Sequence, residues 1–323
     1  MIQVRIAGTA GVVPGPLLST AELARRALPN TPPADVEAKT GISTRAWAPK
    51  GALMSDVGAE ALRGALDRAG LEPRDLRRIL FVTSTGGDAL IPTTSSAIIA
   101  TLGLRGTCDG FDLSNSCMGF LSALDTGARA VATGLFPVGI VVVEMLSRHL
   151  VPEQHRPYMV LGDGAAAVVL TQGAAGEGIV GASFGTDRTL GNTVHLGHPC
   201  VTGEPEHLQF LASNRELTEI GVSTLVRAAK AAVEPSGARL EDIEWVVPHQ
   251  PNGSMLDKMI AALGVDPSRA VPLVEELGSI GAASIPMSLD RLLRTRPVRP
   301  GDRVLMAGIG AGVSYGAMLY QVA

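Results

Sequence analysis

Cys117 and His249 are the two residues whose type and setting predict covalent chemistry. Cys117 follows a polar turn, Ser114-Asn115-Ser116, and precedes an almost uncharged stretch with apolar residues at helical spacing. Ser and Asn are common at helix starts, so we expect Cys117 in the first turn of a buried helix. The helix dipole there favours a thiolate, with a pKa below the usual value of about 8.5, and a nucleophile that needs no metal. The alternative is a small buried hydrophobe, because free cysteine is among the most buried residue types.

His249 directly follows a short apolar run, Trp245–Pro248, that predicts a strand. Loops after the C-terminal ends of parallel strands are where such sheets place their active sites. A histidine beside a cysteine is the usual means of activating a thiol. The alternative is a surface or capping histidine without a chemical role.

A second group of potential ligands comprises His195, His198 and Cys200. Its spacing is only a weak metal signature because no fourth ligand is visible, so we interpret it as a loop over the entrance to the site. The segment Gly162-Asp163-Gly164 lacks the Lys-Ser/Thr of a phosphate-binding loop, which favours a tight turn leading into a strand.

The elements that must position these residues alternate between helix and strand. We expect helices over residues 21–27, 54–70, 92–102, 118–134, 215–235, 253–263 and 281–294. Strands are expected over 2–8, 76–84, 111–113, 138–145, 158–171, 243–248, 270–274, 303–308 and 313–322. The run 138–145 is typical of a strand that is buried on both faces. This alternation predicts an α/β protein with mostly parallel sheets covered by helices.

The same order of elements occurs twice along the chain. Residues 61–82 and 226–247 read alike, and each is followed by a turn and a helix that ends in Leu-Gly. We therefore predict two α/β halves, residues 1–171 with the cysteine and 172–323 with the histidine, related by a pseudo-twofold axis. The helices that begin at Cys117 and near Ser279 should lie at that axis.

The composition of the 323-residue chain excludes several classes of protein. With 46% apolar and 18% charged residues it is globular, and a net charge of −4 without a basic cluster argues against nucleic-acid binding. Three scattered cysteines form no disulfide framework, which favours a reducing cytoplasm. The first residues read as a strand, and no apolar run of about 18 residues predicts a membrane span.

Several motifs together resemble the thiolase-superfamily condensing enzymes, most closely the β-ketoacyl-acyl-carrier-protein synthase III type. The resemblance extends from roughly residue 3 to 322, and its matching pieces are Thr40-Gly-Ile with Arg45, Ile91-Pro92, 112–120, 161–165, 247–252, 281–286 and 308–316. It implies a thiolase-like fold, in which the two halves form a five-layered α-β-α-β-α core.

The resemblance also implies the roles of the site residues. Cys117 would accept an acyl group from a thioester, and the backbone N–H groups of Cys117 and Ala311 would form its oxyanion hole. In the family, the counterpart of His249 and an asparagine hold the second thioester and stabilise its enolate after loss of CO₂. This chain has Ser279 where the asparagine is expected, and a hydroxyl offers one donor against two from an amide.

Ser279 leaves alternatives open for the activity. The family's role is decarboxylative condensation in fatty-acid or polyketide biosynthesis, for which Asn252 or a water would supply the missing donor. An enzyme without decarboxylation would pass the acyl group from Cys117 to an oxygen, nitrogen or sulfur acceptor, with His249 as general base. The third alternative is a non-catalytic partner subunit of a condensing enzyme.

The entrance departs from the family as well. The family's adenine-binding Trp falls near Asp35, so the resemblance favours an acyl-carrier-protein donor over coenzyme A; no further cofactor is implied. Ile91 matches a position that reaches across the family's homodimer to floor the acyl tunnel. The candidates for binding the phosphopantetheine phosphate are Lys39, Arg45, Arg148 and Arg156, for each of which solvated surface charge is the alternative.

Overall fold

Two five-stranded sheets organise the molecule, which is described by a computed structural model covering residues 1–190, 193–203 and 207–323. The first sheet has the order β2-β8-β7-β5-β6 and the second the order β1-β9-β14-β13-β12. Strands of the first are β2 (Arg5–Val12), β5 (Arg78–Val82), β6 (Asp109–Leu113), β7 (Val138–Glu144) and β8 (Gly164–Thr171). Those of the second are β1 (Ile2–Gln3), β9 (Gly178–Thr186), β12 (Trp245–Pro248), β13 (Arg303–Gly310) and β14 (Ser314–Gln321).

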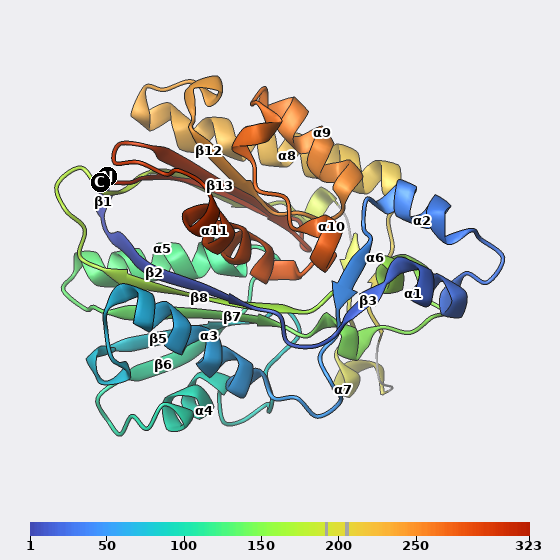
Figure 1. Cartoon of the computed structure of the whole chain (residues 1–323), viewed down its shortest axis with the longest axis horizontal. Coiled ribbons are helices and arrows are strands. Elements are labelled where there is room, and N and C mark those ends of the chain that lie inside the picture. Colours follow the sequence, from blue (N-terminus) through green and yellow to red (C-terminus); the bar gives the residue numbers. More distant parts are fainter. Residues whose placement is uncertain (191–192, 204–206) are drawn as a thin grey trace.

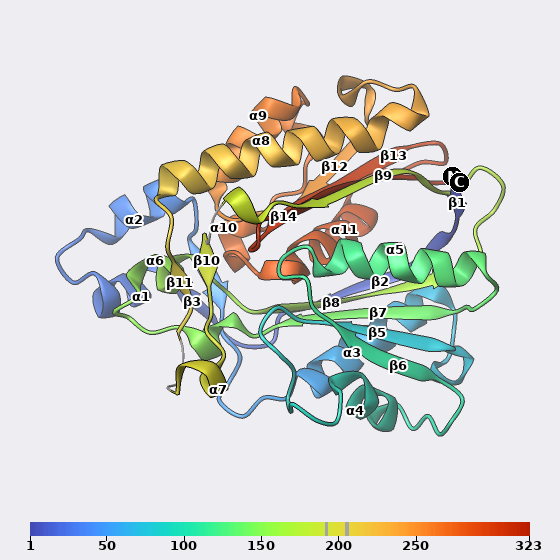
Figure 2. The same ribbon diagram turned by 180° about the vertical axis from the view of Figure 1, so that it is seen from behind.

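Helices cover both faces of both sheets, so the molecule has five layers (Figure 1). Two helices, α5 (Gly119–Ala132) and α11 (Ser284–Thr295), lie between the sheets and form the middle layer. The outer layers are α3 (Met54–Ala69) with α4 (Thr94–Thr101) on the first sheet, and α8 (Asn214–Val233) with α9 (Gly253–Leu263) on the second (Figure 2). This arrangement confirms the predicted α-β-α-β-α order.

The core follows these layers. The central core joins the inner faces of both sheets through α5 and α11. The predicted apolar face of α5 is buried, since Phe120, Leu124, Ala128 and Val131 are each at most 3% exposed. Strand β7 is buried along its whole length, as its apolar run predicts for a strand covered on both faces.

Smaller elements form a lobe at one end of the sheets (Figure 1). Its short strands form two antiparallel pairs, β3 with β4 and β10 with β11. The elements are β3 (Leu17–Ser19), α1 (Thr20–Ala27), α2 (Pro33–Thr40), β4 (Thr44–Ala46), α6 (His155–Val160), β10 (Val194–His195), α7 (Pro199–Thr202), β11 (Gln209–Phe210) and α10 (Val274–Leu277).

Local signals explain where the long helices begin and end. Ser213 and Glu216 form a capping box at the start of α8, in which each side chain accepts from the other residue's N–H. Gly70 and Gly264 end α3 and α9 with φ of 66° and 71°, a conformation that glycine adopts without strain. The prediction of helix over 253–263 is therefore confirmed to the residue.

The sheets are mixed, so the prediction of mostly parallel strands is wrong. Pairs β5–β6, β5–β7 and β12–β13 are parallel, whereas β2–β8, β7–β8, β9–β14, β13–β14 and β1–β9 are antiparallel. Strands that are buried on both faces carry apolar runs in either orientation, so such runs do not reveal direction.

Three local predictions also differ from the structure. Residues 155–160 form α6 before the strand that was expected to begin at 158, and residues 270–273 make only a bridge from Ala270 to Val246 before α10. Strand β9 was not predicted.

The first sheet is built from residues 5–171, but β1 belongs to the second sheet, and the division into halves at 171/172 stays a prediction. Among the described residues, no helix combines the length and apolarity needed to cross a membrane.

Candidate active site

Two glycines of β13 bring the nucleophile and the histidine into one site. A methyl group on Gly308 would lie 3.7 Å from Cβ of His249, and one on Gly310 would lie 3.1 Å from the backbone N of Cys117. Residues two apart on a strand face the same way and are separated by about 7 Å. Cys117, from the first half, and His249, from the second, therefore approach the same face of β13.

Cys117 lies in a tight turn just before α5 rather than in its first turn. The helix begins at Gly119, and the turn is closed by Met118 N donating to Asn115 O (3.0 Å) and Gly119 N donating to Ser116 O (2.9 Å). Ser116 has a φ of 46°, in the left-handed region that few residues other than glycine adopt. Asn115 donates from Nδ2 to Oγ of Ser122 (2.9 Å), and no side chain among the described residues caps α5, so the predicted capping is not seen.

The electrostatic environment of Cys117 opposes the predicted thiolate. Burial, and then the charge of Glu144, raise the pKa of Cys117 to about 12. The residue as a whole is nevertheless half-buried, so solvent reaches part of it. The resting enzyme therefore holds a neutral thiol that must lose its proton as it reacts.

His249 is held by its backbone and keeps both ring nitrogens available. Its N–H donates to Ala307 O (2.8 Å), and the residue is 4% exposed. Neither Nδ1 nor Nε2 has a hydrogen-bond partner among the described residues, and burial lowers the pKa of His249 to about 4. A neutral imidazole carries one donor and one acceptor, so this ring can hold a substrate oxygen or receive a proton.

Gln250, which the sequence reasoning missed, fixes the loop that carries His249. Its Nε2 donates to Val271 O (2.9 Å) and Oγ of Ser288 (3.0 Å), and its Oε1 accepts from the N–H groups of Leu273 (2.8 Å) and Val274 (3.0 Å). The residue is 1% exposed. The only signal in the sequence that could have indicated Gln250 is its position directly after His249.

Ser279 lies on a turn that is attached to the first half through its backbone. Its N–H donates to Val160 O (2.8 Å), and its carbonyl accepts from Gly162 N (3.0 Å). The side chain is buried, and within the described part of the chain its hydroxyl forms no hydrogen bond. The one donor that this hydroxyl offers is thus free for a ligand.

The other predicted site residues near the thiol have defined places. Ala311 lies half-buried in the turn between β13 and β14, where Oγ of Ser314 donates to its carbonyl (3.3 Å). Asn252 is the N-cap of α9, and its Oδ1 accepts from Met255 N (2.9 Å). The Asn252 oxygen is therefore committed to the helix, which leaves only its amide nitrogen for a compensating contact.

Arg45 is not an entrance residue, because it is 0% exposed. Its guanidinium donates to Oγ1 of Thr20 (2.9 Å) and to Met159 O (2.6 Å), and Nε has no partner among the described residues. Burial lowers the pKa of Arg45 to about 10. This residue ties α1 to α6 inside the small lobe and cannot bind a phosphate from solvent.

Two more of the predicted entrance cations have partners within the chain. Arg148 donates to Ala52 O and lies 3.8 Å from the carboxylate of Asp88. Arg156 donates to Phe210 O (3.1 Å), Ala212 O (2.9 Å) and Oδ1 of Asn214 (2.6 Å), which fastens that segment to α6. Lys39, in the last turn of α2, is exposed and is the candidate that stays available.

Ile91 and the histidine-rich loop lie on the surface. Ile91 is 90% exposed, next to Leu90 at 86%. His195 is part of β10, and Nδ1 of His198 accepts from the N–H of Cys200 (3.2 Å). Among the described residues, no group of three or more His, Cys, Asp or Glu side chains is placed to hold a metal ion.

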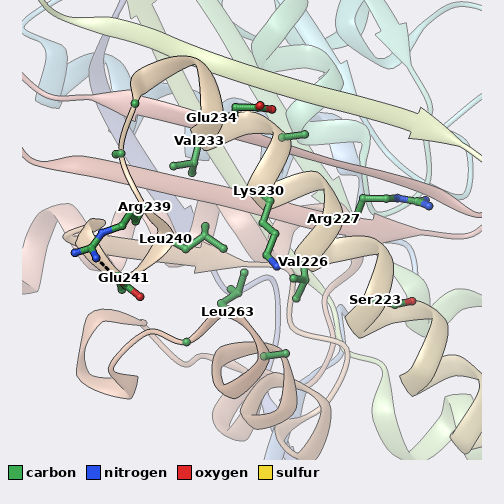
Figure 3. A pocket seen from close by; sticks show the side chains of 15 residues that line it. Ser223, Val226, Arg227, Lys230, Val233, Glu234, Arg239, Leu240, Glu241 and Leu263 are labelled. Carbon is green, nitrogen blue, oxygen red and sulfur yellow. Dashed lines mark ion pairs between the residues drawn. The ribbon is translucent and has the colours of Figure 1, made fainter.

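One cavity lies away from Cys117 and His249. It has a volume of about 1000 Å³ between α8, the end of α9 and the segment 234–241. Figure 3 shows Lys230 and Arg227 projecting from α8, and Arg239 paired with Glu241 on the segment 234–241. No cysteine or histidine is among the described residues that line this cavity, so we assign the chemistry to the face of β13 that carries Gly308 and Gly310.

Comparison with known proteins shows the family of the chain. The descriptions "3-Oxoacyl-[acyl-carrier-protein (ACP)] synthase III" and its C-terminal part match residues 111–188 and 233–322. A β-ketoacyl-[acyl-carrier-protein] synthase III of Streptomyces coelicolor is 33% identical (97% of this chain, 95% of the relative), and one of Hyphomonas neptunium is 32% identical (98% of each).

Solved structures are similar over the same extent. The synthase III of Aquifex aeolicus superposes with a TM-score of 0.90 at 26% identity (98% of this chain, 99% of that one). The priming β-ketosynthase of a polyketide biosynthetic pathway gives 0.90 at 29% (99% and 96%). The chain therefore belongs to the β-ketoacyl-acyl-carrier-protein synthase III family of thiolase-fold acyltransferases.

Proposed function

We propose that the protein is a condensing acyltransferase that works through an acyl-Cys117 intermediate in fatty-acid or polyketide biosynthesis. The observation that carries this proposal is the approach of Cys117 and of a buried His249, with two unpartnered ring nitrogens, to one face of β13. The names of the relatives, all β-ketoacyl-[acyl-carrier-protein] synthases III, support the same reaction class.

In the first half-reaction, the Cys117 sulfur attacks the carbonyl of an acyl thioester. The bond between the carbonyl carbon and the pantetheine sulfur breaks, and the thiol proton of Cys117 leaves with the free pantetheine thiol. The developing oxyanion is held by the N–H of Cys117, beside Gly310, and by that of Ala311. Because the pKa of Cys117 is about 12, proton removal accompanies attack rather than preceding it.

In the second half-reaction, a malonyl thioester loses CO₂ and its enolate carbon attacks the acyl-Cys117 carbonyl. The carbon–sulfur bond to Cys117 breaks, and the thiolate takes up a proton. His249 has a pKa of about 4, so its ring is neutral at physiological pH and donates an N–H to the enolate oxygen, together with the Ser279 hydroxyl.

A second candidate is transfer of the acyl group to an oxygen, nitrogen or sulfur acceptor. The observation that favours it is Ser279, which supplies one donor where an amide would supply two. His249 would then act as general base, for which a pKa of about 4 is poorly matched to neutral pH. This mismatch places condensation first. A role as a non-catalytic partner subunit is less well supported, since both Cys117 and His249 are retained.

We further propose a carrier-protein thioester as donor and a homodimer as the working unit. Lys39 is the one predicted entrance cation without an assigned partner in the described part of the chain, and it suits a single phosphopantetheine phosphate. Leu90 and Ile91 are adjacent apolar side chains at 86% and 90% exposure, which suits contact with a second copy. A cytoplasmic location stays a prediction from the cysteine content.

Incubation with acyl thioesters and intact-protein mass spectrometry tests the proposal. The protein should gain the mass of one acyl group, Cys117→Ala should gain none, and Cys200→Ala, which removes an exposed free thiol, should behave as the parent. CO₂ release from malonyl-carrier protein then identifies condensation. Absence of an adduct, or an adduct that persists in Cys117→Ala, would sink the proposal, whereas an adduct without CO₂ release favours the heteroatom acceptor.

A further inference from the structure

Glu144 is a buried carboxylate that the proposed reaction does not use. It is the last residue of β7, on the first sheet, and it is 0% exposed. Its pairing partner on β8 is Gly164. Burial raises the pKa of Glu144 to about 7. Burial of a carboxylate is unfavourable unless hydrogen bonds compensate for the lost hydration.

The carboxylate joins the first sheet to the start of the last central helix. Ser84 donates to it from Oγ (2.5 Å) and from N (3.1 Å), at the end of neighbouring β5. Ala282, in the helical turn η7 (Gly281–Ala283) that leads into α11, donates its N–H to Oε1 (3.0 Å). Glu144 thereby connects the two halves of the molecule through one side chain.

The segment held by Glu144 is the turn that carries Ser279. Gly281 has a φ of 52°, and a side-chain carbon there would lie 2.9 Å from Oε1 of Glu144. Ser279 itself is bonded through its backbone to Val160 and Gly162. The first half therefore holds this turn at two points, at Ser279 itself and at Ala282, where the contact is made by Glu144.

The charge of Glu144 also reaches the nucleophile. It is the second cause, after burial, of the raised pKa of Cys117. The groups that bond to Glu144 from β5 and η7, and its neighbour Gly164 on β8, are uncharged. In the described part of the chain, no ammonium or guanidinium is bonded to the carboxylate, and the effect that opposes it at the thiol is a hydrogen bond from the backbone of Cys117.

We propose that Glu144 is a positioning residue of this site: its carboxylate sets the Ser279 turn relative to Cys117, and its charge restrains ionisation of the Cys117 thiol in the free enzyme. The inference rests on the proposed function of Cys117 as the acylated nucleophile. A thiol that stays protonated between turnovers resists alkylation and oxidation, because the thiolate is the reactive form.

Alkylation of Cys117 by iodoacetamide across pH 7–11 tests the effect of charge. Glu144→Gln keeps the size of the side chain and an oxygen that accepts from Ala282, but it removes the charge. We expect alkylation at pH 8 to be on the order of tenfold faster, with the pH profile displaced to lower values, because one pKa unit changes the thiolate fraction tenfold. Glu177→Gln, at another buried carboxylate, which accepts from the hydroxyl of Tyr320 (3.0 Å), should leave the profile unchanged.

Glu144→Asp tests the positioning role, because it keeps the charge and shortens the side chain by one methylene group. Its alkylation profile should match the parent, while malonyl-dependent CO₂ release falls at least tenfold and acylation of Cys117 persists. A parental alkylation profile in Glu144→Gln, or unchanged CO₂ release in Glu144→Asp, would overturn the proposal. Alkylation needs no thioester, so it can succeed even if Cys117 is never acylated, which separates this failure from that of the proposed function.

Discussion

Gly310→Ala should slow acylation of Cys117 about a hundredfold or more while leaving its alkylation nearly unchanged. The added methyl group would lie 3.1 Å from Cys117 N, 3.3 Å from Met118 N and 3.0 Å from Oγ of Ser314. Few side-chain carbons in proteins come this close to such atoms, so the methyl group covers the N–H of Cys117 or turns it away. Loss of one oxyanion donor costs about 10²- to 10³-fold in rate, or ~3–4 kcal/mol.

The assay compares two reactions of one sulfur. Acylation by a thioester develops an oxyanion and is followed by rapid quenching and intact-protein mass spectrometry. Alkylation by iodoacetamide is a displacement at carbon that develops no oxyanion, so it reports only whether the thiol is present and accessible. Gly11→Ala is the matched control, because its methyl group would meet atoms of Asp290 and Met287 at ordinary distances of 3.5 and 3.6 Å.

Two results would refute the reasoning. Acylation of Gly310→Ala at the parental rate would mean that the N–H of Cys117 does not hold the oxyanion. Equal losses of acylation and alkylation would mean that the methyl group displaces the sulfur itself, which also removes the basis for the oxyanion assignment.

Three further outcomes are expected. Ser279→Asn should raise malonyl-dependent CO₂ release about 10- to 100-fold in a radiometric assay and leave acylation unchanged, because the amide adds a second donor; no gain would argue against an enolate contact there. Gln250→Ala should lower the free energy of unfolding in urea by about 3–5 kcal/mol, since it removes four buried hydrogen bonds; a loss below 1 kcal/mol would contradict this. Stability should fall as pH decreases from 6.5 to 4, by about 3 kcal/mol at most, because His249 binds a proton in the unfolded chain that the folded state, with its pKa near 4, excludes. Glu144, whose folded pKa is raised to about 7, makes the free energy of unfolding rise as pH decreases from 7 to 4.5. Urea titrations of the parent and of His249→Asn across this range therefore isolate the effect of the histidine. Identical pH dependence in the two proteins would refute its contribution.

The layered fold could be predicted because the spacing of apolar residues and the residues at helix ends, which are local patterns, indicate the duplicated order of helices and strands. Helix starts and ends at Ser213 and Gly264 are short-range signals that the structure retains. Strand direction was predicted wrongly because apolar runs such as 164–171 look the same in parallel and antiparallel pairs.

The candidate nucleophile and histidine could be named from the sequence, but their electrostatics could not. The Cys117 turn closes two residues before α5, so the expected helix-dipole effect is replaced by burial and by the charge of Glu144, which is 27 residues away in the sequence. Arg45 was misplaced for the same reason: an arginine on a short strand reads as exposed until tertiary packing encloses it. Long-range burial leaves no local signature in the chain.

The first strand carries a consequence for how ligands reach the interior. β1, at the very start of the chain, adds to the edge of the second sheet beside β9, while β2, only two residues later, joins the first. A continuous stretch of backbone thus connects the two sheets at the end of the molecule where the two termini lie (Figure 1). Separation of the two sheets would also expose the central core that both share through α5 and α11, so the proposed acyl chain would have to enter between the side chains of a packed interior.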